Sequence, residues 1–382
     1  MKKTAIILSS LLLFISRIGV GQNYSIELPY EVVQGKLIVK AIVEGVEGNY
    51  LFDTGASTMI THDYFNKLAT KIINEKTITD VNNQEATFEE TTLKSILLGT
   101  ERHIEFQQVK TFVLNEGNPV EYLNVNGIIG SNLFNNLVLR VDSKRKVITI
   151  SNNTDEYSLT PLYQIKMQPN GQNLPIIKVN MGNYTEPVLF DTGADLFYSM
   201  NTPTYEKVKD SGFIETLFSG FGATSMGLSG AEEASEKFRI KIPQIKIGRG
   251  KFQNITAETM TSPISLLGTK LLDYGIVTID FAQGLFYFEP YDESTLPDLY
   301  RKRWNIDITP SGDHLIVGGV WGSMKKQLEG GERIISINGE KIGKVNLQDV
   351  LSKNIVNLDG EKIKIVVLNK KGEEKEIVIS KE

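Results

Sequence analysis

The sequence predicts a mainly β fold of two tandem β-barrel lobes followed by a small α+β module. Short apolar runs bounded by glycine, asparagine or aspartate recur along residues 25–290, which is typical of strands joined by tight turns. The chain also contains a duplication, because Leu-Phe-Asp-Thr-Gly-Ala-Ser at residues 51–57 returns as Leu-Phe-Asp-Thr-Gly-Ala-Asp at residues 189–195. The two aspartates, Asp53 and Asp191, are separated by 138 residues (191 − 53).

Two further pairs of residues keep the same separation. Gly130 ends a Gly-Ile-Ile-Gly run and Gly268 ends a Ser-Leu-Leu-Gly run (268 − 130 = 138). Asp142 and Asp280 each follow an apolar residue in the same register (280 − 142 = 138). Three pairs in one register indicate a large tandem duplication and not a short-period repeat.

Composition excludes several classes of protein. The 382 residues suggest two or three domains, and 41% hydrophobic with 23% charged residues fits a globular protein with a core. A formal net charge of -5 argues against nucleic-acid binding. Cysteine is absent, and the three histidines, His62, His103 and His314, are scattered without metal-ligand neighbours. We therefore predict no cofactor and no metal site.

The N-terminus has the pattern of a cleaved secretory signal peptide over residues 1–21. Two lysines precede an apolar run over residues 5–15, and the small residues Gly19 and Gly21 supply a cleavage site. The alternatives are a buried helix and a membrane-spanning helix. The run is short for a helix that spans a membrane. The prediction is a secreted or periplasmic protein, working outside the cytoplasm, with no membrane span after signal cleavage.

The two lobes are expected over residues 22–155 and 156–296, joined by the polar segment 152–156. In the first lobe we expect a polar hairpin over 77–91, one helical turn over 133–137, and strands over 36–43, 50–52, 95–98, 108–113 and 125–129. In the second lobe strands are expected over 174–179 and 188–190, and a glycine-rich hairpin segment over 220–227.

The C-terminal module is expected over residues 297–382. Its predicted elements are strands over 305–308 and 315–321, helices over 323–328 and near 347–352, and a terminal hairpin around 370–372. Because this module carries neither aspartate of the repeated motif, a chain ending near Pro297 is expected to keep the activity of the two lobes on short substrates.

Two aspartates held side by side behave differently from isolated carboxylates. Like charges at contact distance cannot both ionise, so the pair shares one proton and titrates as a unit. One carboxyl group can then take a proton from water while the other donates to a carbonyl oxygen, which suffices to hydrolyse an amide without a metal. Thr54 and Thr192 can hydrogen-bond across the two loops, and Gly55 and Gly193 let the backbone approach the carboxylates.

The two Asp-Thr-Gly-Ala stretches, each followed further on by two apolar residues and a glycine, resemble the active-site motifs of retropepsin-like aspartic proteases. The resemblance covers about residues 25–290 and implies an aspartic endopeptidase acting on a peptide or protein substrate. It implies a catalytic pair, Asp53 and Asp191, and supporting residues that surround it: Thr54, Gly55, Thr192, Gly193, Gly130 and Gly268. Since one chain carries both motifs, the resemblance implies a monomer.

Proteases of this family close a hairpin, the flap, over the substrate. The residues Gly220, Phe221 and Gly222 in the second lobe resemble a mobile flap, whereas the corresponding Asn82-Asn83 tip of the first lobe has no glycine. An ordinary flexible loop is the alternative. Ala56 and Ala194 take the place of a hydroxyl that would stabilise the charged pair, which predicts a weakly acidic to near-neutral optimum.

Residues 328–339, Leu-Glu-Gly-Gly-Glu-Arg-Ile-Ile-Ser-Ile-Asn-Gly, resemble the corresponding stretch of PDZ domains. That resemblance implies a module that binds peptide ligands by strand addition. The segment Tyr300–Trp304 stands where the family has a glycine-rich carboxylate-binding loop, and it contains no glycine. A peptide-binding domain and a purely structural PDZ-like cap therefore both remain open.

Three functions compete at this point. An endopeptidase needs both aspartates, and both are present. A non-catalytic peptide-binding protein would keep the lobes and use the PDZ-like module as its working part. A glycoside hydrolase also uses paired acids, but its carboxylates come from different loops and not from matched turns.

Overall fold

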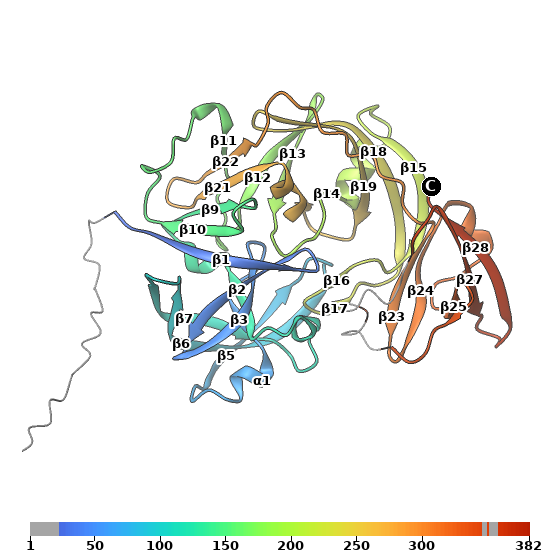
Figure 1. The fold of residues 1–382 in the computed structure, drawn as a ribbon, viewed down its shortest axis with the longest axis horizontal. Coiled ribbons are helices and arrows are strands. Elements are labelled where there is room, and N and C mark those ends of the chain that lie inside the picture. The colour runs from blue at the N-terminus through green and yellow to red at the C-terminus, as the bar shows by residue number, and fades with distance from the viewer. Residues whose placement is uncertain (1–22, 346–349, 351–357) are drawn as a thin grey trace, which may run out of the picture.

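The computed structural model describes residues 23–345, 350 and 358–382, and within them the protein is mainly β (Figure 1). The expected signal peptide and nearly all of the helix expected near 347–352 lie outside the described residues. Among the described residues no helix is long and apolar enough to cross a membrane.

The first repeat follows the predicted order of strands, and its one predicted helical turn is a 3-10 turn. Its strands are β1 (Ser25–Val33), β2 (Lys36–Val43), β3 (Val46–Asp53), β4 (Met59–Ile60), β5 (Ile72–Thr79), β6 (Glu85–Leu98), β7 (Ile104–Val113), β8 (Gly127–Gly130), β9 (Val138–Asp142) and β10 (Val147–Ser151). Its helical segments are α1 (His62–Phe65), η1 (Pro119–Leu123) and η2 (Ser131–Phe134).

The second repeat has a similar order of elements. Its strands are β11 (Gln164–Lys166), β12 (Ile176–Met181), β13 (Tyr184–Phe190), β14 (Tyr198–Asn201), β15 (Glu215–Gly222), β16 (Met226–Gly227), β17 (Gly230–Ala231), β18 (Ser235–Ile247), β19 (Gly250–Met260), β20 (Ser265–Leu267), β21 (Gly275–Asp280) and β22 (Leu285–Pro290). Its helical segments are η3 (Pro161–Tyr163), α2 (Thr202–Val208) and η4 (Thr269–Asp273).

The C-terminal module contains β23 (Ile306–Ser311), β24 (His314–Trp321), η5 (Gly322–Lys326), β25 (Arg333–Ile337), β26 (Glu340–Lys341), β27 (Lys362–Leu368) and β28 (Glu374–Ser380). The helix expected over 323–328 is instead the single 3-10 segment η5. The module has its own apolar core, built around residues such as Leu315, Val317 and Ile365.

Alternating burial explains why the strands next to the acid turns form where they do. In β2, Leu37, Val39, Ala41 and Val43 are buried, so one face of the strand covers the core. The two residues that connect β2 to β3 both have positive φ, at 50° for Glu44 and 82° for its glycine neighbour. Such a turn matches the twist of a hairpin and fixes the register of β3.

Both acid turns follow a strand that lies parallel to another strand of the same repeat. β3 runs parallel to β8, with Asp53 opposite Gly130, and β13 runs parallel to β20, with Phe190 opposite Leu267. In each repeat the parallel neighbour is therefore the apolar run that ends in a glycine. These are the two runs that the sequence analysis found at the same separation as the two aspartates. This pairing positions both acid turns in the same way.

Six antiparallel strands of a larger, 13-stranded sheet join the two repeats in the order β11-β22-β21-β9-β10-β1 (Figure 1). At its centre β9 of the first repeat pairs with β21 of the second, with Leu139 opposite Ile279. Leu139, Ile279 and their buried neighbours belong to one apolar core that spans both repeats. The repeats thus share a sheet and a core, which holds the two acid turns in a fixed relation.

Candidate active site

The two acid turns have matching local geometry. In the first repeat the backbone N–H of Gly55 donates to Asp53 Oδ1 over 2.8 Å, and in the second the N–H of Gly193 donates to Asp191 Oδ1 over 2.7 Å. Asp53 is half-buried and the Asp191 side chain is buried. Each turn therefore holds its carboxylate with its own backbone.

Thr54 and Thr192 tie the two turns together with four hydrogen bonds. The Thr54 hydroxyl donates to the Phe190 carbonyl over 2.7 Å and accepts from the Thr192 N–H over 3.1 Å. The Thr192 hydroxyl donates to the Phe52 carbonyl over 2.8 Å and accepts from the Thr54 N–H over 3.0 Å. Both threonines are almost completely buried, so water does not compete for these bonds.

The glycines of the two turns are required by the close approach of the carboxylates. A Cβ on Gly55 would stand 2.6 Å from Cγ of Asp191, and a Cβ on Gly193 would stand 2.4 Å from an Asp53 carboxylate oxygen. Each carboxylate thus packs against the glycine of the opposite turn. This cross-packing brings the two carboxyl groups together.

The surroundings of the pair disfavour ionisation of both carboxyl groups at once. Burial, the charge of Asp191 and a hydrogen bond to it raise the pKa of Asp53 well above its usual range. Burial also raises the pKa of Asp191, while its hydrogen bond with Asp53 and the Lys36 ammonium act in the opposite direction. One proton is therefore held between the two carboxyl groups at pH values where isolated aspartates are ionised.

Gly130 and Gly268 occupy equivalent places behind the turns. A Cβ on Gly130 would stand 2.3 Å from the backbone carbon of Ser57, and one on Gly268 would stand 2.3 Å from the Ala194 carbonyl oxygen. Just past each glycine, a backbone N–H donates to the alanine carbonyl of the acid turn, from Ser131 over 3.0 Å and from Thr269 over 2.9 Å. These glycines let the parallel strand pass directly beside the turn.

Gly220, Phe221 and Gly222, which the sequence predicts as a mobile flap, lie at the end of a strand in the structure. These residues end β15, which pairs with β18 on one side and with β24 of the C-terminal module on the other. A Cβ on Gly220 would stand 2.5 Å from the ring of Trp321. Its lack of a side chain allows close packing against the module, and the predicted mobility stays a prediction.

The tips of two hairpins, one from each repeat, meet in the structure. The second repeat contributes β16 and β17, and the first contributes the turn between β5 and β6. The Ser225 hydroxyl donates to Asn82 Oδ1 over 2.6 Å, and the Ser229 N–H donates to Asp80 Oδ2 over 2.9 Å. The Asn82-Asn83 tip, which has no glycine, is therefore one of two interacting tips.

Each tip also packs against an apolar cluster of the opposite repeat. Leu228, between β16 and β17, packs against an apolar cluster of the first repeat that includes Ala56. Val81 packs against the corresponding cluster of the second repeat, which includes Ala194. The two alanines directly follow the Asp-Thr-Gly triplets, so each hairpin tip packs against the same apolar cluster as one acid turn.

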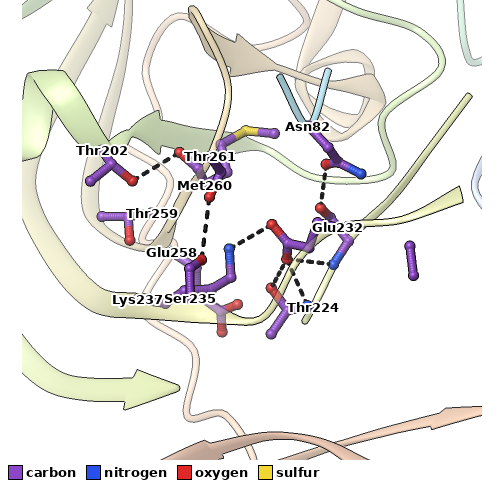
Figure 2. Close-up of polar contacts among 12 residues, drawn as sticks. Asn82, Thr202, Thr224, Glu232, Ser235, Lys237, Glu258, Thr259, Met260 and Thr261 are labelled. Atoms are coloured by element: carbon purple, nitrogen blue, oxygen red, sulfur yellow. Dashed lines mark hydrogen bonds and ion pairs between the residues drawn. The ribbon is translucent and has the colours of Figure 1, made fainter. Parts of the chain in front are cut away.

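A buried ion pair fixes the base of the second hairpin. Figure 2 shows the Lys237 ammonium and the Thr224 hydroxyl directed at the Glu232 carboxylate, over 2.7 and 3.1 Å. The N–H groups of Thr224 and Ser225 also donate to Glu232, over 2.6 and 2.9 Å. With Glu232 and Lys237 both buried, this network holds the segment between β15 and β16.

Lys36 is a residue of the site that the sequence did not identify. It begins β2, and its ammonium donates to the backbone carbonyl of Gly193 in the acid turn of the other repeat. Lys36 does not belong to a recognisable local motif. A comparison of the two repeats would have singled it out, because the equivalent residue of the second repeat, 138 positions later (174 − 36), is the uncharged Leu174. Among the described residues, no group of three or more potential ligands could hold a metal ion.

Comparison with known proteins gave similarities of fold only. No family model matches the chain, and no curated protein matches its sequence. One similar structure is a retropepsin-like aspartic protease from Rickettsia conorii, at 20% identity and a TM-score of 0.25, covering 34% of this chain and 91% of that one. Another is entitled the crystal structure of edgp, at 9% identity and a TM-score of 0.42, covering 70% of this chain and 94% of that one. Neither similarity is close enough to carry an assignment of function.

Proposed function

We propose that this protein is an aspartic endopeptidase that hydrolyses peptide bonds outside the cytoplasm. The observation that carries the proposal is the pair of cross-packed carboxyl groups, Asp53 and Asp191, inside an interlocked pair of Asp-Thr-Gly turns, where burial raises the pKa of both. Such a pair supplies one acid and one base at the same moment.

The reaction follows from that protonation state. The ionised carboxylate takes a proton from water as the water oxygen attacks the peptide carbonyl carbon, and the protonated carboxyl gives its proton to the carbonyl oxygen. The resulting tetrahedral diol then collapses: the first carboxyl protonates the departing amide nitrogen, the C–N bond breaks, and a diol hydroxyl returns its proton to the second. The products are a carboxylic acid and an amine, and the pair regains its single proton.

The hairpin tips give this site a means of excluding water. Leu228 and Val81 pack against the same apolar clusters as the alanines of the two acid turns, so we expect the tips to separate for a peptide substrate and then to close over it. Both acid turns come from one chain, which supports a catalytic monomer. Binding of a separate peptide ligand by the C-terminal module stays a proposal of its own.

Conservative substitution of each aspartate tests the assignment. Either Asp53→Asn or Asp191→Asn should abolish cleavage of an unfolded protein substrate, because each removes half of the shared-proton pair. The exposed Asp210 offers a matched control, and Asp210→Asn should retain wild-type activity. Activity of the wild type should also persist in EDTA.

Two outcomes would overturn the proposal. One is substantial cleavage by either single variant whose circular-dichroism spectrum matches that of the wild type. The other is loss of wild-type activity in EDTA that added divalent metal restores.

A further inference from the structure

We propose that a pocket between the second repeat and the C-terminal module binds an extended segment of a protein substrate that carries apolar side chains and an acidic residue. The inference rests on the proposed function, because it gives the endopeptidase a contact with long substrates away from the aspartate pair. The pocket has a volume of about 530 Å³, within the range of pockets that bind ligands.

Both walls of this pocket are mostly apolar. The second repeat contributes Phe221 at the end of β15, together with Ala223 and Ala234 of the hairpin segment that follows. The module contributes Ile316 of β24 and Leu328 of the stretch that resembles PDZ domains. The pairing of β15 with β24 brings the two walls together (Figure 1).

Two large apolar side chains of the pocket are left uncovered. Phe221 lies opposite Val320 in the β15–β24 pairing, yet it is 51% exposed. Ile316 is half-buried, between Leu315 and Val317 of the module core. Since side chains alternate along a strand, Ile316 points away from that core and toward the pocket. Exposed apolar side chains gathered around a pocket mark a place where another molecule binds.

The pocket is separate from the edge at which PDZ domains add a peptide strand. Among the described residues β23 pairs with β24 alone, so its outer edge stays open for such a strand. The pocket lies instead where β24 meets the second repeat. A ligand in it contacts the module and the base of the second hairpin at the same time.

The second hairpin connects the pocket to the acid turns. Leu228 at its tip packs against the same apolar cluster as Ala56, and Ala234 at its base lines the pocket. The segment between them, about six residues at about 3.3 Å each, spans at most roughly 20 Å. A substrate held at the aspartate pair therefore reaches the pocket with about six further residues in an extended conformation.

The rim of the pocket carries one positive charge that no acid of the protein offsets. Its charged residues are Lys325, Glu329 and Lys370. Glu329 and Lys370 form an ion pair over 3.1 Å. Lys325 donates to the Ser219 hydroxyl over 2.5 Å, and in the part of the chain that the structure describes no carboxylate pairs with it. An acidic residue beside the apolar side chains of the ligand complements this charge.

Binding of an unfolded protein to full-length Asp53→Asn tests the inference without requiring activity. The probe is reduced and carboxymethylated α-lactalbumin, which is acidic and stays unfolded, and fluorescence anisotropy gives its Kd. Adding Phe221→Asp should raise the Kd about tenfold, the scale of one apolar side chain losing its burial. Lys325→Glu should raise it about threefold and Lys325→Arg should leave it in place. The matched control is Val378→Asp, at an exposed apolar residue of β28. Phe221→Asp or Lys325→Glu with the Kd of this control would overturn the inference.

A photoreactive benzoylphenylalanine in place of Ala234 locates the contact. Irradiation should cross-link it to α-lactalbumin, and the same residue in place of Val378 should give no cross-link. Equal capture at both positions, or a cross-link only between two copies of the chain, would overturn the inference. If the protein changed at Ala234 does not fold, the Kd values still decide. Cross-linking of an unfolded protein that the wild type does not cleave would count against the proposed function alone, and cleavage without cross-linking would count against the pocket alone.

Discussion

Replacing Thr54 by valine should destabilise the protein and open the junction between the acid turns. Valine keeps the volume of threonine but removes the hydroxyl, which donates to the Phe190 carbonyl and accepts from the Thr192 N–H. Thr54 is 1% exposed, so water cannot replace either partner. Two buried backbone groups left without partners cost about 1–3 kcal/mol each, or roughly 2–6 kcal/mol in total.

Urea unfolding followed by far-ultraviolet circular dichroism measures this loss. Thr54→Ser is the matched control: it keeps the hydroxyl and loses one methyl group, at a cost of about 1 kcal/mol. Adding Thr192→Val to Thr54→Val should cost less than the sum of the two single changes, because the first already loosens the shared junction. A Thr54→Val protein within about 0.5 kcal/mol of the wild type, the range of ordinary surface substitutions, would refute this account of the interlock.

The remaining predictions concern the contact between the lobes and the C-terminal module. Burial and the nearby Glu258 raise the pKa of Asp307 to about 6, against the lowering effects of the Trp321 indole and the cations Arg239 and Arg303. Because the pKa of Asp307 is higher in the folded than in the unfolded protein, its protonation stabilises the folded state. This contribution is complete below about pH 4 and is lost as the pH rises through about 6. Tryptophan fluorescence during thermal unfolding should show this dependence, and Asp307→Asn should remove it; an unchanged profile in the variant would contradict the assignment. The sequence alone led us to expect that a chain ending near residue 297 keeps its activity on short peptides, but the structure pairs β15 with β24. Loss of that pairing should lower the cleavage of short peptides, and full wild-type turnover would show that the pairing is dispensable.

Much of the site could be predicted from the sequence because its signals are local and repeated. The strand before each acid turn, the Asp-Thr-Gly triplet and the later apolar run with its glycine all lie in short stretches. The shared register then indicated that Asp53 and Asp191 form one pair. The glycines of the same triplets, Gly55 and Gly193, were expected to let the backbone approach the carboxylates. In the structure each of them packs against the carboxylate of the opposite turn.

Other features depended on residues far away in the chain. Glycine serves either mobility or close packing, and at Gly220 the choice is decided by Trp321, about a hundred residues later, whose ring needs the space. Lys36 looks like an ordinary residue at the start of a strand, and only the position of Gly193 gives its charge a role. The helix expected over 323–328 is a shorter 3-10 segment. The residue composition of this stretch did not distinguish a 3-10 segment from an α-helix.

The attachment of the C-terminal module makes the two hairpins unequal, although their tips meet. β15 lies between β18 and β24, and Arg239 of β18 reaches into the module, donating to the Trp304 carbonyl over 2.6 Å and stacking on Trp321. β5 of the first repeat pairs with β6 alone and ends its sheet, and most of its residues are exposed. Strands with an open edge and few buried contacts separate from their sheet at lower free energy than strands paired on both sides. Admission of a substrate should therefore depend mainly on movement of the β5–β6 hairpin, the one that its sequence marked as the less mobile.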